Sequence, residues 1–233
     1  MNRAIPLFSL ALSLLSSAAC QASAPTPEPV VADQAPVPEK IDTGPTSMES
    51  EIGGLDEYAI DKAFASLDIT HCIEPRAAEL DQLGGELHLK LRIDRRGNAR
   101  WAYLSRSTLG DREAEKCVLD LARAKSWPKP LSGEGLAEKE VTIDPRAEPV
   151  ALDERSDRAP IAEARAEAGK CKKGIDGSFL ATVYVQPDGT VATAGVSVPN
   201  EKGEDVADCM VDALRKMHFK STEKLAKLSF EIR

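Results

Sequence analysis

The chain has 233 residues, of which 42% are hydrophobic and 4% aromatic, and its formal net charge is −8. This composition suits one or two small soluble domains with modest aliphatic cores. It excludes a general nucleic-acid-binding surface, because such a surface needs an excess of basic residues. The acidity is concentrated in residues 21–54, which carry six acidic side chains and one lysine.

The N-terminus has the features of a secretory signal peptide at residues 1–19. Arg3 supplies the positive charge, and the apolar stretch after it is shorter than the roughly 20 residues that span a bilayer. Small residues lead up to Cys20 in a pattern that resembles a bacterial lipobox, which implies a lipid anchor on Cys20. Gln21, where an aspartate would resemble an inner-membrane retention signal, favours the outer membrane on its periplasmic side. The alternative is ordinary signal cleavage, which would leave a soluble periplasmic protein.

Residues 20–54 are rich in proline, alanine and acidic residues, so we expect a disordered tether between the membrane and the folded part. Beyond the tether, an internal repeat organises the chain. Four residues recur 92 positions later: Gly85, Gly97, Cys117 and Trp127 correspond to Gly177, Gly189, Cys209 and Phe219. The repeat predicts one domain at residues 55–145 and another at residues 161–233, joined by a linker at residues 146–160.

In the first copy, apolar periodicity predicts a helix at 55–67, an alternating strand at 85–94 and a returning strand at 99–106. A change of phase between Ala99 and Ala102 indicates a β-bulge in the returning strand. A second helix begins near Asp111, and a strand at 139–144 completes the copy. The second copy repeats this order, with a shorter first helix near 161–168 and a last strand at 227–232. The predicted fold class is α+β, with two tandem α-β-β-α-β domains, each a three-stranded sheet with its helices on one face.

Each copy holds two cysteines, and helices that cover the same face of a small sheet bring those cysteines together. We therefore predict the disulfides Cys72–Cys117 and Cys171–Cys209, each worth about 3–4 kcal/mol in the chain-entropy model. A zinc site is an alternative, but zinc favours close-set ligands, and His71, His88 and His218 show no such spacing. A redox role for the cysteines is a second alternative, but the chain has no C-x-x-C motif. We expect neither a metal nor a cofactor.

The first copy resembles the AgmX/PglI C-terminal domain family over about residues 53–144. The resemblance is carried by the paired cysteines, the stretch Ser107-Thr108-Leu109 and the segments GGLDEYAI, ITHCIEP, GELHLKLRIDRRGNA and WPKP. The sequence departs from the family at Ile73, where a tyrosine is common, and in the final strand, which lacks a Tyr-Pro pair. The resemblance implies a TonB/TolA-type C-terminal fold in a protein of the bacterial envelope and no catalytic residues.

The uncovered face of the first sheet is the candidate binding face, with His88, Lys90 and Arg92 on one strand and Trp101 and Tyr103 on the next. Exposed aromatic side chains beside cations suggest a surface that contacts a protein or a glycan. The alternative is that this face packs against the second copy, whose matching residues are Leu180, Thr182, Tyr184, Thr193 and Gly195.

We identify no catalytic residue in the sequence, because Asp111, Glu113 and Glu115 suit the start of a helix and no catalytic motif is present. The sequence and the resemblance together favour a non-enzymatic, lipid-anchored envelope protein that binds or scaffolds other envelope proteins. Strand addition to a sheet edge is the expected mode of binding. Two alternatives stay open: a component of a motility, secretion or transport apparatus, and a periplasmic redox factor or enzyme.

Overall fold

The computed structural model describes residues 41–42, 54–152, 154–155 and 157–233, all of which belong to one compact unit, residues 35–233. The predicted signal peptide, Cys20 and most of the predicted tether lie outside the described residues. Within the described residues the fold is mixed α+β with two sheets. None of the helices in these ranges is long and apolar enough to cross a membrane.

The first half of the chain, residues 54–145, builds its sheet from β2 (Gly85–Ile93), β3 (Ala99–Ser107) and β4 (Gly135–Ile143). The two-residue β1 (Ile41–Asp42) adds to β4, so the strand order is β1-β4-β2-β3 and every pairing is antiparallel. The expected three-stranded sheet therefore has one strand more than predicted. A segment of two residues is too short to give a periodic signal in the sequence.

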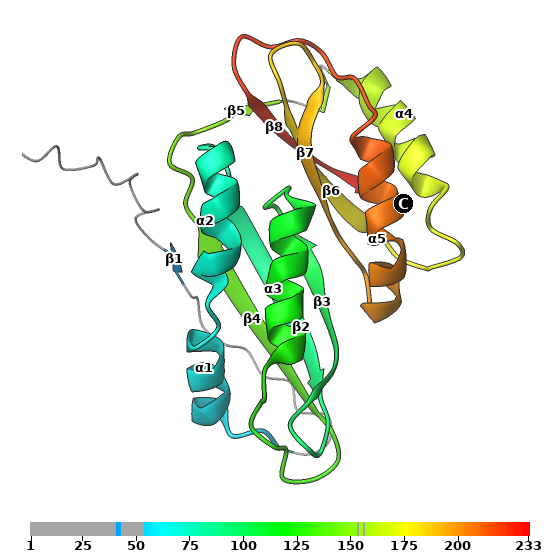
Figure 1. Ribbon diagram of the computed structural model, residues 1–233. Coiled ribbons are helices and arrows are strands. Elements are labelled where there is room, and N and C mark those ends of the chain that lie inside the picture. The colour runs from blue at the N-terminus through cyan, green and yellow to red at the C-terminus, as the bar shows by residue number, and fades with distance from the viewer. Residues whose placement is uncertain (1–40, 43–53, 153, 156) are drawn as a thin grey trace, which may run out of the picture. The chain divides into compact units, whose positions relative to one another are not determined.

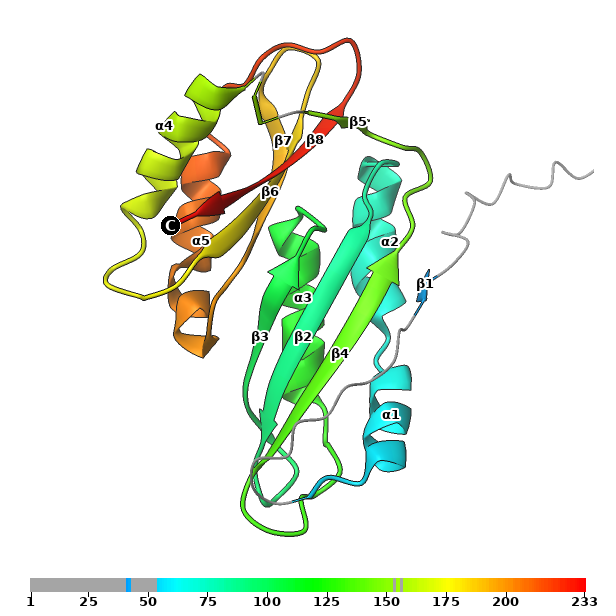
Figure 2. The same ribbon diagram turned by 180° about the vertical axis from the view of Figure 1, so that it is seen from behind.

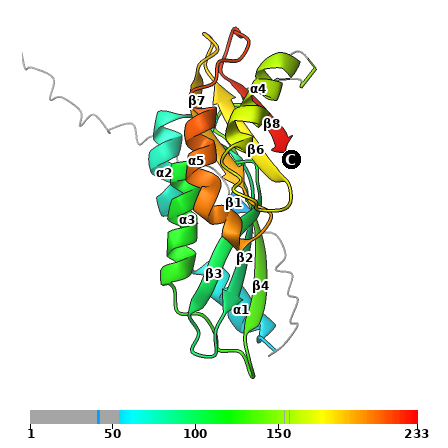
Figure 3. The same ribbon diagram turned by 90° about the vertical axis from the view of Figure 1, so that its right-hand side faces the viewer.

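The helices α2 (Ile69–Glu79) and α3 (Arg112–Ala124) lie on one face of this sheet (Figures 1 and 3). The helix α1 (Glu57–Ala65) adds Ile60 and Phe64 to the same apolar cluster. Strict alternation along β2 directs its apolar side chains to that face, where Leu87, Leu89, Leu91 and Ile93 are buried. The sequence did not predict α2 as a separate helix, because Pro75 lies inside it and proline usually marks a helix end. Asp68 begins this helix as its N-cap by accepting a hydrogen bond from the His71 amide.

The second half, residues 146–233, repeats the arrangement with β6 (Phe179–Val185), β7 (Val191–Ser197) and β8 (Ala226–Ile232). The helices α4 (Arg158–Gly169) and α5 (Glu204–Leu214) cover one face, and a short 3-10 turn, η1 (Glu201–Gly203), precedes α5. The predicted linker contributes β5 (Val150–Ala151), which pairs with β8 in parallel and gives the order β5-β8-β6-β7.

Fine details of the backbone recur at the 92-residue interval. Arg100 is the extra residue of the predicted bulge in β3, and Ala192 is the extra residue at the equivalent place in β7. Gly97 and Gly189 both turn their hairpins with positive φ, at 87° and 94°. A side chain at either glycine would also collide with the carbonyl oxygen of Trp127 or of Phe219. The repeated glycines and aromatics of the sequence thus serve the same close backbone contact in each half.

Both predicted disulfides are confirmed. Cys72 on α2 is bonded to Cys117 on α3, and Cys171, just after α4, is bonded to Cys209 on α5. Each bond links two helical segments within one half, with Cα atoms 5.5 Å and 5.8 Å apart.

We expect the double variant Cys72→Ala/Cys117→Ala to lose about 4 kcal/mol of unfolding free energy, because the bond closes a loop of 45 residues. Urea unfolding followed by circular dichroism measures this loss. Wild-type protein carried through the same transition with a reductant should unfold still earlier, since it lacks both bonds. An unfolding midpoint equal to that of the oxidised wild type would show that the bond does not stabilise the fold.

Candidate interaction surface

The three basic side chains of the candidate binding face each lie beside a glutamate across the sheet. His88 lies opposite Glu140 and Lys90 lies opposite Glu138, with nitrogen–oxygen distances of 3.0 and 2.5 Å. Arg92 pairs with Glu134, just before β4, at 2.7 Å, and Arg100 binds the same carboxylate. The side chains of this ladder are about a quarter to two-thirds exposed, so each pair stabilises the fold by at most about 1 kcal/mol. The face is an array of balanced charges rather than a cationic patch.

The two aromatic residues of the candidate face, Trp101 and Tyr103, lie opposite Arg92 and Lys90 on β3 and contact the second half of the chain. Their rings pack on each other with centroids 5.3 Å apart, and both belong to the apolar cluster of the second half. Tyr103 is only 9% exposed, and this burial raises the pKa of its hydroxyl. The expectation that Tyr103 is exposed is therefore wrong, and Trp101 is only partly exposed beside it. Their placement agrees with the alternative that this part of the face packs against the second half.

Each half inserts a tyrosine into the apolar cluster of the other. Tyr103 of the first half lies in the cluster of the second, and Tyr184 of the second half is fully buried in the cluster of the first. Its hydroxyl accepts a hydrogen bond from the Gly84 amide at 3.2 Å and lies 3.0 Å from the carbonyl oxygen of Gln82. Burial raises the pKa of Tyr184 to about 12, so the hydroxyl stays protonated. We call the contact region between the two halves the seam.

The seam has a polar centre at Asp111, which is 1% exposed. This carboxylate caps α3 by accepting from the Ala114 amide at 2.9 Å, as the sequence predicted. It also accepts from the Arg76 guanidinium of α2, at 2.8–3.2 Å, and from the Thr193 hydroxyl of β7, at 2.9 Å. The Arg76–Asp111 hydrogen bond raises the pKa of Arg76 further above its ordinary value. One side chain therefore joins two helices of the first half to a strand of the second.

Equivalent positions of the two repeats meet at the seam with opposite charges. Arg112 binds Glu204, which is 92 residues later, and Lys116 binds Asp208, also 92 residues later, at 3.0 and 2.9 Å. The Arg112–Glu204 pair is almost fully buried, with side chains 7% and 10% exposed. The repeats pair as unlike partners, because two copies of the first would place cation against cation.

Glu115 is a fully buried carboxylate at the seam. Ser107 donates to its Oε1 at 2.6 Å, whereas its Oε2 has no hydrogen-bond partner in the described part of the chain. Burial raises its pKa to about 7, against the opposing effects of Ser107 and Arg112. A β-carbon at Gly195 of β7 would collide with this carboxylate, so the glycine is required for the close approach.

The sequence offered a contact between the copies as the alternative for the candidate face, and Tyr184, Thr193 and Gly195 of that alternative do lie at the seam. It assigned Asp111, Glu113 and Glu115 only to the start of a helix, so the charged part of the seam was not predicted. A signal for it was present in the repeat. Arg112 and Lys116 align with Glu204 and Asp208, and opposite charges at matched positions are what a contact between the copies requires.

The sheet edges differ in what they face. The edge at β3 lies against the second half, where the Val198 amide donates to the carbonyl oxygen of Leu104 at 2.9 Å. The edge at β4 carries β1 over Thr142 and Ile143 only, among the described residues (Figure 2). The edge at β8 carries β5 over Ala226 and Lys227, and the Arg165 guanidinium binds the carbonyl oxygen of Glu231 farther along. The β4 edge is thus the least covered edge that the described residues show.

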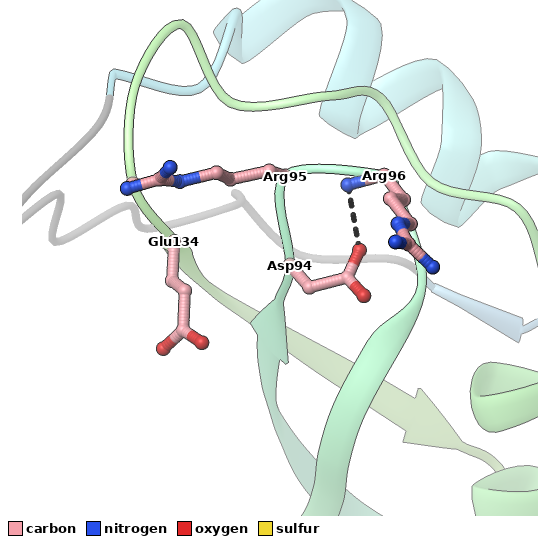
Figure 4. A pocket seen from close by; sticks show the side chains of 5 residues that line it. Asp94, Arg95, Arg96 and Glu134 are labelled. Carbon is pink, nitrogen blue, oxygen red and sulfur yellow. Dashed lines mark hydrogen bonds between the residues drawn. The ribbon is translucent and has the colours of Figure 1, made fainter.

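Two hollows lie at the ends of the first sheet. One, of about 400 Å³, is formed by the turn at Asp94 together with Arg95, Arg96 and Glu134 (Figure 4). Asp94 accepts from the Arg96 and Asn98 amides, and the bond from Asn98 lowers its pKa. This carboxylate thus serves the turn, and the arginines around the hollow point in different directions, so the hollow has no converging groups that suit a ligand (Figure 4).

The other hollow, of about 430 Å³, includes Glu86, Arg106 and Lys227. Burial lowers the pKa of Lys227 to about 8, which leaves the ammonium largely protonated at neutral pH. It donates to the carbonyl oxygen of Gly84 at 2.5 Å and lies 5.3 Å from the Tyr184 ring centroid. Lys227 therefore strengthens the seam. Beside this hollow, Glu86, His88 and Glu140 place one ligand atom each within 4.8 Å of one another.

We expect Arg112→Ala to lower the unfolding free energy by about 3–5 kcal/mol, because it leaves Glu204 buried without its charged partner. Lys116→Ala is the matched control. Its pair with Asp208 is about half exposed, so the loss should stay below about 1 kcal/mol. A double-mutant cycle with Glu204→Ala measures the coupling, and equal losses in the two single variants would contradict a buried seam.

Glu115 predicts a pH dependence. Its pKa rises from 4.5 to about 7 on folding, so its stabilising contribution is fully present below pH 4.5 and is lost as the pH rises through 7. The unfolding free energy of Glu115→Gln relative to the wild type should therefore increase by about 2–3 kcal/mol between pH 5 and pH 8. Urea unfolding across this range tests it, and parallel pH profiles for the two proteins would refute it.

The chain was compared with family models, with curated proteins and with solved structures, and none of the three comparisons gives a match.

Proposed function

We propose that this protein is a non-enzymatic, lipid-anchored envelope protein that binds another envelope protein by taking one of its extended segments onto the β4 edge. Its two halves would be tandem TonB-like domains, in keeping with the AgmX/PglI resemblance. The observation that carries the proposal is the β4 edge itself. The seam covers the β3 edge, and β1 shows that an antiparallel segment fits on β4.

The hydrogen-bonding direction of β4 supports this mode of binding. Glu86 of β2 faces β3 with both its amide and its carbonyl, so the neighbouring Gly85 and Leu87 face β4. Leu87 lies opposite Val141, so odd-numbered residues of β4 pair with β2. Even-numbered residues, Glu138 among them, present their backbone groups at the edge, where a partner strand would meet them.

The charges on β4 define the partner further. Glu138 and Glu140 lie on the open face of the sheet and are about one-third and two-fifths exposed. A strand added beside them gains cross-strand pairs if it carries lysine or arginine at alternate positions. The partner we propose is therefore an extended segment with alternating basic residues.

The proposed location rests on the secretory signal and lipobox-like sequence at Cys20, and it is supported by the two disulfides. Disulfides form and persist in oxidising compartments such as the periplasm, and they are rare in the reducing cytosol. The Cys72–Cys117 bond is shielded, with Cys72 4% exposed and Cys117 half-buried, which suits a structural bond better than redox exchange, whereas Cys209 of the second bond is exposed. This favours a binding module over the redox alternative.

A photo-crosslinking amino acid at position 136, on the β4 edge, tests the proposal in the cells that make the protein. We expect one crosslinked product of defined mass, which Glu138→Pro abolishes because proline removes the backbone N–H that the partner strand needs. The matched control, Glu138→Ala, keeps the N–H and should keep the product. A product that survives Glu138→Pro in folded protein, or that both variants lose equally, would refute strand addition at β4.

A further inference from the structure

Three side chains on the open face of the first sheet converge: Glu86 and His88 from β2, and Glu140 from β4. We propose that they form a binding site for a divalent transition-metal ion, of which Zn²⁺ is the best fit. The site shares Glu140 with the proposed strand addition, but zinc binding needs no partner, so the two proposals can fail separately.

The sheet register places the three ligands together. Residues two apart on a strand share one face, so Glu86 and His88 point the same way, and His88 lies directly opposite Glu140. One oxygen of each carboxylate and one imidazole nitrogen lie within 4.8 Å of one another. The His88 Nε2 to Glu140 Oε1 distance is 3.0 Å, close to the roughly 3.3 Å between ligand atoms around tetrahedral zinc.

The chemistry of the set favours zinc over magnesium or calcium. Zinc accepts both imidazole nitrogen and carboxylate oxygen as ligands, whereas magnesium and calcium take oxygen ligands alone. Two carboxylates neutralise a divalent charge, and three protein ligands leave a position for water or for a donor from another molecule.

The neighbouring rows of the same face show what distinguishes this one. Lys90 with Glu138 and Arg92 with Glu134 are each a fixed cation beside a carboxylate, which leaves no donor for a metal. The imidazole of His88 has a nitrogen lone pair that can bind a metal ion, unlike the ammonium of Lys90 or the guanidinium of Arg92. His88 and Glu140 can therefore bind an added cation together. The backbone there is held on both sides, with His88 between Glu140 of β4 and Arg106 of β3.

Arg106 opposes metal binding. Its Nε lies 3.8 Å from Glu86 Oε2, and its guanidinium is more than half exposed. The arginine therefore competes for one ligand at close range and repels a cation. Its removal should strengthen the site rather than weaken it.

Calorimetric titration with zinc alone tests the proposal, on the full chain at pH 7.5 purified without a histidine tag. We expect one zinc ion per chain, and His88→Ala or Glu140→Gln should weaken binding at least about tenfold, since even outer partners of a metal ligand cost about that much. Arg106→Gln should tighten binding severalfold. His71→Ala, at an exposed histidine on α2, is the matched control and should bind as the wild type does.

Three results would overturn the proposal: no saturable binding of one zinc ion, equal binding by His88→Ala and the wild type, or equal losses in His88→Ala and His71→Ala. Circular dichroism confirms that each variant is folded, as the partial exposure of His88 and Glu140 leads us to expect. A magnesium titration should give no comparable binding, and equal affinities for the two ions would also contradict the proposed donor set.

Discussion

The carboxylate of Asp111 is the constraint on which the arrangement of the chain depends. It is almost fully buried, and it accepts hydrogen bonds from three elements. The donors are the Ala114 amide in the first turn of α3, the Arg76 guanidinium of α2 and the Thr193 hydroxyl of β7. A buried carboxylate must have such partners, because its desolvation is costly. The carboxylate therefore selects a structure in which the helices of the first half and the sheet of the second half are correctly placed at once. The disulfide Cys72–Cys117 joins the same two helices and restricts them to positions where Arg76 reaches Asp111.

The seam around Asp111 determines which surfaces are available for function. It takes Tyr103 and the edge at β3 out of the candidate binding surface, and it buries Glu115 and Arg112. The balanced charge ladder on the open face and the edge of β4 stay outside it. Both proposals use this outer region: strand addition uses the backbone at Glu138, and metal binding uses the row of His88 and Glu140. The seam thus occupies one side of the first sheet, and both proposed binding functions lie on the other.

Local patterns predicted most of each half. The alternation of apolar residues predicted β2, and Gly97 predicted the hairpin turn. The change of phase after Ala99 predicted the bulge, whose extra residue is Arg100. The cysteine pairs followed from helices that share a face. The helix α2 was not predicted because Pro75 obscured it, and β1 and β5 are too short to show periodicity. The seam depends on contacts about 100 residues apart, such as Gly84 with Tyr184, and residue spacing within one element carries no information about them. Of the candidate face, the sequence predicted the cations on the open side, whereas burial of Tyr103 depends on the second half.

The central claim is that the two halves are joined through a buried seam, and amide hydrogen exchange at Val198 tests it most directly. This amide follows β7 and donates to Leu104 of β3, so it can exchange only when the seam opens. The account predicts that Val198 exchanges as slowly as amides in the centre of β6, and that Asp111→Ala speeds its exchange far more than it speeds theirs. Exchange of Val198 in the wild type as fast as that of an exposed loop amide such as Gly174 would contradict the claim.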